Sequence, residues 1–231
     1  MKTDSCVIQE TDSVIKLFCI EAQYHRELAV YSSQAPHIPQ LLDYGEVADS
    51  KDHIPGYNWF IRCRRINALP YLDFQNGFHP DLMGTAIARF HQHSFDGNQA
   101  LCHIDNQPRN ILFDGSGYWL VDFSDSRFEV PEYDLTHLFL FWVEEFPTPL
   151  MQNYVLSFLA DYTELIQPRA QEWQASLAIN IKRFAERRNR FNRQARKRPE
   201  PELDSGREWL NNSRQIHNYL LAKTTDVFTM A

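Results

Sequence analysis

Short apolar alternations open the chain and predict a hairpin followed by a helix. Cys6–Gln9 and Val14–Cys19 are two β-like runs on either side of a polar turn, which is the pattern of a β-hairpin. Residues 20–34 then carry helix-forming residues with an approximate apolar face. Two further apolar runs, joined by a polar loop, predict two more strands: Leu41–Val47 and Trp59–Ile66.

The spacing of apolar residues becomes helical from about residue 80. Leu82, Ala86, Ile87 and Phe90 repeat at helical spacing within Asp81–His93. The other predicted elements are the strands Asn110–Phe113 and Tyr118–Val121 and helices over residues 134–146, 150–166, 170–196 and 207–222. A small strand-rich part with one helix is thus followed by a larger helical part, and this order predicts an α+β fold.

Composition narrows the class of protein. The chain has 231 residues, of which 43% are hydrophobic, and this suits one globular unit or two small lobes that share a core. The longest apolar run, Leu138–Val143, is too short to cross a bilayer. The polar N-terminus shows no secretion signal, and the cysteines form no CxxC pair. Both features favour reduced thiols and a cytoplasmic location.

The net charge of −7 is unevenly distributed. Residues 182–198 hold nine Lys/Arg and one Glu, or +8, so the rest of the chain carries −15. An acidic bulk argues against a broad nucleic-acid-binding face. The basic stretch is interpreted either as the solvated back of a packed helix or as a contact with an anionic surface. His91 and His93 resemble a metal pair, but we interpret them as a helix end, since no further ligand stands at suitable spacing.

Candidate chemistry is concentrated in Cys102–Leu135. Asp105 is followed five residues later by Asn110, and Asp122 comes twelve residues after that, behind the apolar strand Trp119–Val121. Ordinary turn chemistry accounts for each of these residues alone but not for the ordered set. In-line phosphoryl transfer needs a carboxylate to accept the proton of the attacking hydroxyl, and oxygen ligands to place Mg²⁺ on the phosphates. Such residues at this spacing are compatible with that chemistry.

The pattern His-x-Asp-x-x-x-x-Asn, followed by a hairpin and Asp-Phe, resembles the catalytic loop and metal site of kinase-like phosphotransferases. The resemblance is to the aminoglycoside phosphotransferase and lipopolysaccharide kinase branch. It implies that Asp105 is the catalytic base and that Asn110 and Asp122 bind Mg²⁺. It also implies that His103 stabilises the loop and that Asp134 supports the loop backbone from the following helix.

The N-terminal hairpin adds a second match to the same family. Lys16 lies in the apolar run Val14–Leu17, and Glu27 follows eleven residues later on the predicted helix. Alone, they would be an edge-strand lysine and a solvated glutamate. The resemblance implies instead that Lys16 holds the phosphates of the nucleotide and that Glu27 orients it. The strand Trp59–Arg65 would enter the hinge between the lobes, where Cys63-Arg64-Arg65 stands in place of the family's usual glutamate and aromatic residue.

Two departures from the family pattern change the expected function. The first glycine is Gly45, so no Gly-rich loop precedes Lys16. Either the protein binds nucleotide without that loop, or the start of the sequence is truncated, or the activity is weak or absent. Only eleven residues separate Asp122 from Asp134, and Ile104 replaces the arginine that pairs with a phosphorylated loop. The second departure favours a small-molecule or sugar hydroxyl over a peptide as acceptor.

These features together imply a protein-kinase-like two-lobe fold. A reduced nucleotide-binding N-lobe would span residues 1–66, and a helical catalytic C-lobe residues 67–231. The implied reaction moves the γ-phosphate of ATP (or GTP), with Mg²⁺, to a hydroxyl of a small molecule or sugar. One alternative is a lipopolysaccharide core sugar kinase that contacts an anionic membrane surface through residues 182–198. Another is a pseudokinase that acts as a binding or regulatory module.

Overall fold

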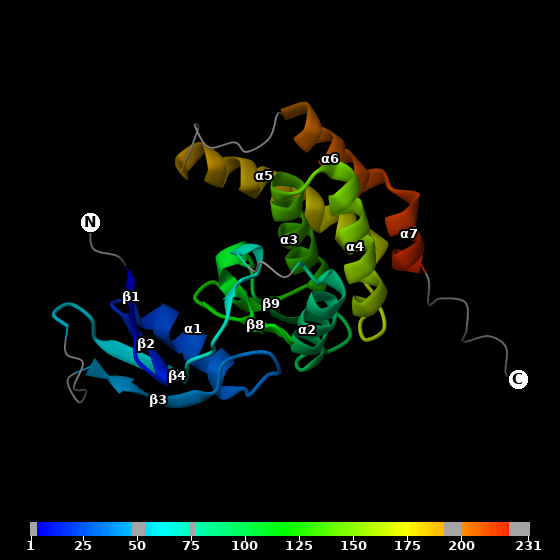
Figure 1. Ribbon diagram of the computed structural model, residues 1–231. Helices are drawn as coiled ribbons and strands as arrows, with labels where there is room; N and C mark the ends of the chain where they lie inside the picture. The colour runs from blue at the N-terminus through cyan, green and yellow to red at the C-terminus, as the bar shows by residue number, and fades with distance from the viewer. Residues whose placement is uncertain (1–3, 48–53, 74–76, 192–199, 222–231) are drawn as a thin grey trace, which may run out of the picture.

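The computed structural model describes residues 4–47, 54–73, 77–191 and 200–221. Figure 1 shows an antiparallel sheet with one helix at the N-terminal end of the molecule and a larger, mainly helical part beside it. The predicted α+β architecture is therefore confirmed. Among the described residues, no helix is both long enough and apolar enough to cross a membrane.

The N-terminal sheet has four antiparallel strands in the order β1-β2-β4-β3. They are β1 (Ser5–Gln9), β2 (Ser13–Phe18), β3 (Leu41–Glu46) and β4 (Trp59–Arg64), and the helix α1 (Glu21–Ser32) connects β2 to β3. Because side chains alternate along a strand, Ile15 and Leu17 of β2 enter a small apolar cluster. Lys16 between them faces the opposite side of the sheet. All four predicted strands and the predicted helix are confirmed. Each of their ends lies within two residues of the predicted position.

Two small sheets lie between the N-terminal sheet and the helices. One has the order β5-β7-β8 and the other pairs β6 with β9. The strands are β5 (Leu69–Pro70), β6 (Ala100–Cys102), β7 (Ile111–Phe113), β8 (Tyr118–Leu120) and β9 (Arg127–Glu129), with 3₁₀ turns at Tyr71–Asp73 and Pro108–Asn110. Residues 103–110 connect β6 to β7, so both ends of this loop are held by a strand. The predicted lobe division after residue 66 falls between β4 and β5.

The helical part comprises α2 (Pro80–Gln92), α3 (Pro131–Glu145), α4 (Thr148–Tyr162), α5 (Ala170–Phe191), α6 (Glu200–Asn212) and α7 (Arg214–Leu221). The single helix predicted over 207–222 is wrong, because two helices meet at Ser213. The Ser213 hydroxyl accepts a hydrogen bond from the Gln215 main-chain N–H at 3.2 Å and so caps the start of α7. The helix predicted over 134–146 begins earlier, at Pro131, a residue that suits a first helical turn. Of the helix predicted over 170–196, the part after residue 191 lies outside the described residues.

The main apolar core lies among these helices. Trp142, Phe139, Phe158 and Trp173 are fully buried in it, so the apolar run in α3 is core, as its sequence predicts. Helices α2 and α4 approach closely at Gly84, where an added Cβ would stand 2.4 Å from the carbonyl oxygen of Phe158. Only glycine permits this approach, which fixes α2 against α4.

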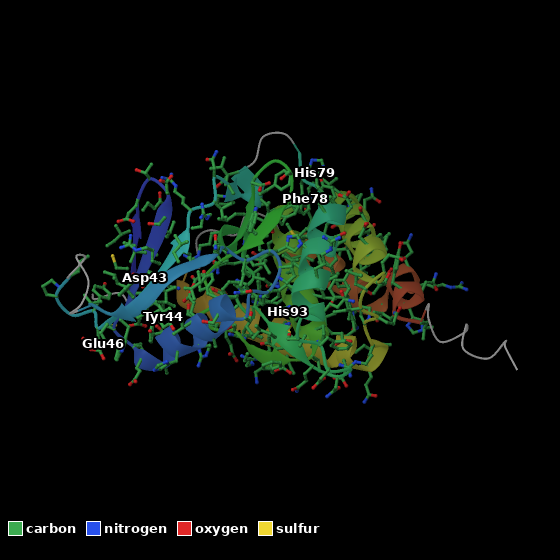
Figure 2. All side chains as sticks on the ribbon, turned by 90° about the horizontal axis from the view of Figure 1, so that it is seen from below. Asp43, Tyr44, Glu46, Phe78, His79 and His93 are labelled. Atoms are coloured by element: carbon green, nitrogen blue, oxygen red, sulfur yellow. The ribbon has the colours of Figure 1, made fainter. Side chains whose placement is uncertain are left out.

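An aromatic cluster joins the start of α2 to this core. Figure 2 shows Phe78 and His79 at this point, far from Asp43, Tyr44 and Glu46 on the edge strand β3 of the N-terminal sheet. Among the described residues, the ring of Phe78 contacts the rings of Tyr71, Trp142, Phe146 and Tyr154. These contacts hold the segment between the small sheets and α2 onto the helical part.

Candidate active site

Asp134, in the first turn of α3, fixes the backbone of the loop 103–110. Its Oδ2 accepts a hydrogen bond from the main-chain N–H of His103 at 2.6 Å, and its Oδ1 accepts one from that of Ile104 at 2.8 Å. Ile104 has a φ of +70°, a conformation that costs energy in a β-branched residue. The ring of His103 also lies 2.8 Å, through Nε2, from the carbonyl oxygen of Val121. The loop is thus tied to both α3 and the strand before Asp122.

A buried network extends from Asp134 to α2 and α4. His91 Nε2 lies 3.1 Å from Asp134 Oδ2, and His91 Nδ1 lies 2.9 Å from the Tyr162 hydroxyl. Burial opposes ionisation of Asp134, but the hydrogen bond and charge of His91 outweigh it and hold the pKa of this carboxyl below its ordinary value. We call His91, Asp134 and Tyr162 the buried brace. Cys102 also approaches His91 and Asp134, with ligand atoms within 4.8 Å, yet hydrogen bonds already engage Asp134 and both His91 nitrogens.

Asp105 lies at the start of the turn that follows these fixed residues. Its side chain is partly exposed, and Oδ2 accepts a hydrogen bond of 2.7 Å from Gln107 Nε2. Asn110 Nδ2 donates to the Asp105 main-chain oxygen at 2.8 Å and lies 3.4 Å from Oδ2. The amide nitrogen of Asn110 is therefore engaged inside the loop, and its oxygen is the atom that remains to bind a cation.

Lys16, Glu27 and Asp122 form a second charged group, which we call the cleft cluster. Lys16 Nζ lies 2.7 Å from Glu27 Oε2 and 2.6 Å from Asp122 Oδ1. The side chain of Glu27 is 1% exposed and that of Lys16 13%, whereas that of Asp122 is 36% exposed. Asp122 has a φ of +67°, and its carboxylate also accepts a hydrogen bond from the Ser124 hydroxyl at 2.6 Å. The cluster joins β2, α1 and the segment after β8.

Burial and neighbouring charges together determine the pKa of each member of the cleft cluster. Burial disfavours the charged form of Lys16, but the carboxylates of Glu27 and Asp122 outweigh it and raise the pKa of this lysine. Burial likewise opposes ionisation of Asp122, and Lys16 with Ser124 keeps its pKa below the ordinary value. At Glu27 burial dominates and raises the pKa, since Lys16 offsets it only in part. The cluster therefore places a stable cation beside an ionised, partly exposed carboxylate.

The ring of Phe123 packs between α1, α2 and the loop 103–110. Its ring makes an edge contact with Tyr31 of α1 at 5.4 Å between centroids, stacks on Phe90 at 5.7 Å and lies 4.9 Å from the His103 ring. One buried ring thus contacts α1, α2 and the loop 103–110. The position of Glu27 on α1 is thereby coupled to that of Asp122, the neighbour of Phe123.

A cleft of about 630 Å³ collects these groups. Lys16, Glu27, Asn110 and Asp122 line it, and Asp105 lies beside it through its contact with Asn110. Apolar side chains from three strands (Val7, Val14 and Leu112) and the connection 64–68 between β4 and β5 line the same cleft. An apolar slot next to a polar, cationic end suits a planar base joined to phosphates. The predicted hinge segment Cys63-Arg64-Arg65 lies on this cleft.

The five site residues predicted from sequence are therefore brought together by segments far apart in the chain. Sequence reasoning missed two residues that contact them, Gln107 on Asp105 and Ser124 on Asp122. It also missed the contact of His91 with Asp134. Gln107 and Ser124 each lie two residues from the aspartate they contact, so local spacing could have indicated them. His91 gave no such signal, because only the packing of α2 brings it to Asp134.

Comparison with known proteins gives a family model that matches the central part of the chain. The family model described as "Phosphotransferase enzyme family" matches residues 59–173, a range that contains Asp105, Asn110, Asp122 and Asp134 but not Lys16. No curated protein sequence matches the chain. The predicted resemblance to kinase-like phosphotransferases of the aminoglycoside type is confirmed.

Solved structures show the same fold at low sequence identity. An aminoglycoside phosphotransferase from Alicyclobacillus acidocaldarius superposes with a TM-score of 0.59 and 11% identity, over 96% of this chain and 90% of that one. A choline/ethanolamine kinase family protein from Mesorhizobium loti gives 0.56 and 14%, over 96% and 90%. A spectinomycin phosphotransferase, solved with ADP and spectinomycin, gives 0.54 and 10%, over 95% and 90%. These similarities confirm the kinase-like fold.

Proposed function

We propose that this chain, which belongs to the phosphotransferase enzyme family, transfers the γ-phosphate of ATP (or GTP) to a hydroxyl group of a small molecule or sugar. The observation that supports this most is the shared cleft. Lys16, Asn110 and Asp122 come from separate segments and line one pocket, with Asp105 at its edge. A phosphotransferase needs this combination of cation, metal ligands and carboxylate base.

Asp105 is proposed as the base that positions and deprotonates the acceptor hydroxyl. A carboxylate suits this role because it accepts hydrogen bonds only. Gln107 occupies Oδ2 at 2.7 Å and so restricts how the carboxylate can rotate. The backbone on either side is fixed by Asp134 and by the 3₁₀ turn at Pro108–Asn110, which limits the movement of Asp105 when a hydroxyl approaches.

Asn110 and Asp122 fit a magnesium ion. Both offer oxygen donors, which Mg²⁺ prefers, and two protein ligands with phosphate and water oxygens make up its usual set. Bound Mg²⁺ would supply charge neutralisation at the phosphates. The low pKa of Asp122 keeps its carboxylate ionised and ready to bind a cation at neutral pH.

Lys16 is proposed to hold the phosphates of the nucleotide, and Glu27 to orient Lys16. The raised pKa of Lys16 keeps the ammonium group charged. In the structure this group lies between Glu27 and Asp122. When phosphates and a metal bind, Lys16 would keep its contact with buried Glu27 and exchange Asp122 for a phosphate oxygen.

A small acceptor is supported by the length of chain between the two aspartates. Residues 123–133 run from the cleft through β9 into α3, and no separate peptide-docking segment stands there. The solved relatives include a spectinomycin phosphotransferase in complex with its substrate and a choline/ethanolamine kinase family protein. Both names describe kinases of small molecules, and they support the same class of acceptor here.

The proposal is tested by Asp105→Asn in an assay that follows ADP release with a panel of sugars, amino sugars and amino alcohols. Loss of the base is expected to lower turnover about 10²- to 10⁴-fold while nucleotide affinity is kept. Asp43→Asn on the edge strand β3, at a residue that does not line the cleft, is the matched control and should leave turnover unchanged. Unchanged turnover in Asp105→Asn would refute the assignment of the base. Absence of both turnover and nucleotide binding in the wild type would favour a binding module.

A further inference from the structure

Two arginines from distant segments meet on one buried aromatic ring. Tyr133, at the start of α3, is buried with Cys102 and Ile104. The guanidinium carbon of Arg127, from β9, lies 5.2 Å from the centre of its ring, and that of Arg183, from α5, lies 6.0 Å from it. Arg183 Nη1 also donates a hydrogen bond of 2.6 Å to the Tyr133 hydroxyl. The ring therefore contacts two cationic groups, whose guanidinium carbons lie at most about 11 Å apart.

The positive charge of this pair is only partly neutralised. Arg127 lies 3.4 Å from Glu129, and its side chain is 45% exposed. Within the described part of the chain, Arg183 has no ion pair, and its neighbour Lys182 is exposed. Two positive charges on one ring, with one counter-charge between them, favour an anion from solution. Guanidinium groups match phosphate and carboxylate oxygens because they donate two parallel hydrogen bonds.

The pair lies close to the candidate catalytic loop. Strand pairing places Arg127 opposite Cys102, and Asp105 follows Cys102 by three residues, which span at most about 11 Å. Arg109, within the loop, is exposed and lines the cleft. Figure 1 shows that the C-terminal end of α5, the helix of Arg183, extends from α3 toward the side of the N-terminal sheet. Arg127 therefore lies on the strand that pairs with β6, and β6 leads directly into the loop of Asp105.

We propose that Arg127 and Arg183, held on Tyr133, bind an anionic group of the acceptor, a phosphate or a carboxylate, while the acceptor hydroxyl lies at Asp105. This inference rests on the proposed function and specifies its substrate class. The bulk of the protein is acidic, but the acceptor side of the loop would then be basic. A phosphorylated or acidic sugar fits this site better than a polycationic aminoglycoside.

The binding site is tested without turnover, by calorimetric titration of the full chain with inorganic phosphate and, separately, with acetate. Arg127→Gln and Arg183→Gln should each weaken binding of the preferred anion about tenfold or more. Lys182→Gln removes one neighbouring charge that does not contact Tyr133, and its affinity should stay within about twofold of the wild type at physiological salt. Preference for phosphate would assign a phosphate ester, and preference for acetate a carboxylate.

Melting temperatures of the same variants separate binding from a purely structural role. If either arginine variant melts lower but binds the anion as the wild type does, the arginines only join α5 to α3 and the proposal is overturned. Absence of binding of both anions overturns it as well. Should Arg183→Gln not fold, Arg127→Gln still decides, because that side chain is 45% exposed and its replacement leaves no buried cavity.

A second arm compares sugars with one skeleton, namely glucosamine, glucose, glucuronate and glucose 6-phosphate, in the ADP-release assay. The anionic sugars should show the lower KM, and Arg183→Gln should remove that advantage. Preference for glucosamine would refute the anionic acceptor but leave the phosphotransferase proposal intact. Anion binding that depends on the arginines, together with absence of nucleotide binding, would refute the phosphotransferase proposal alone.

Discussion

The cleft cluster and the buried brace are both built around an aspartate whose pKa is lowered, yet they differ in exposure. Asp134 is 2% exposed and accepts hydrogen bonds from two main-chain N–H groups beside His91. Asp122 is 36% exposed and contacts Lys16 and Ser124. A fully satisfied buried carboxylate holds a backbone in place, whereas a partly exposed one can exchange its partners. We infer that the brace provides geometry and that the cleft cluster provides chemistry.

Substitution of Asp134 should give the largest difference between the buried brace and the cleft cluster. Asp134→Asn removes the charge and one of the two acceptors that serve His103, Ile104 and His91, and buried donors are left without partners. The free energy of unfolding should fall by about 3 kcal/mol. Asp122→Asn should change it by less than about 1 kcal/mol, since the exposed carboxylate adds little to stability. Urea unfolding measures both values. Equal losses in the two variants would contradict the division of roles.

The brace also depends on how closely α2 and α4 pack, because His91 lies on α2 and Tyr162 on α4. Gly84→Ala would place a Cβ 2.4 Å from the Phe158 carbonyl oxygen, so the helices must separate, at a cost of about 1–3 kcal/mol. Gly117→Ala is the matched control, since no atom lies within 4 Å of its added Cβ. It should cost less than ~0.5 kcal/mol in the same urea experiment. A neutral Gly84→Ala would show that the helix contact is not needed.

The pH dependence of the unfolding free energy is a smaller effect, and its sign follows from the lowered pKa of Asp134. The pKa of Asp134 is lowered from 3.8 in the folded protein, so its ionised form stabilises the fold above that pH. This contribution is lost as the pH falls through the folded pKa. The difference in unfolding free energy between wild type and Asp134→Asn should therefore be constant between pH 7 and about pH 5 and shrink below 3.8. Shrinkage already between pH 7 and pH 6 would mean that another group controls the brace.

Site residues could be predicted from the sequence where they belong to a short local pattern. Asp105, Asn110 and Asp122 lie within one short segment, and their order and spacing indicated the loop and the returning hairpin. Lys16 was indicated by its position in an apolar strand, where alternation places it opposite Ile15 and Leu17. In each case the signal that indicates the residue lies within one short stretch of sequence.

The contacts that depend on packing could not be predicted in this way. The strands β6 and β9 have three residues each, too few to show a period. His91 was interpreted only as part of a helix end, since its approach to Asp134 is created by the packing of α2. Arg183 was counted as part of a basic stretch, and only the fold brings it to Tyr133 next to Arg127.

Nucleotide binding tests the central claim most directly. We expect ATP with Mg²⁺ to stabilise the wild type by about 2.7 kcal/mol at one hundred times its Kd, which raises the melting temperature of a chain of this size by roughly 5–10 °C. ATP with EDTA should give a smaller rise. Asp122→Asn should reduce the response to Mg²⁺ while its melting temperature without ligand stays near that of the wild type. The claim would be contradicted if ATP and Mg²⁺ left the melting temperature of the wild type unchanged.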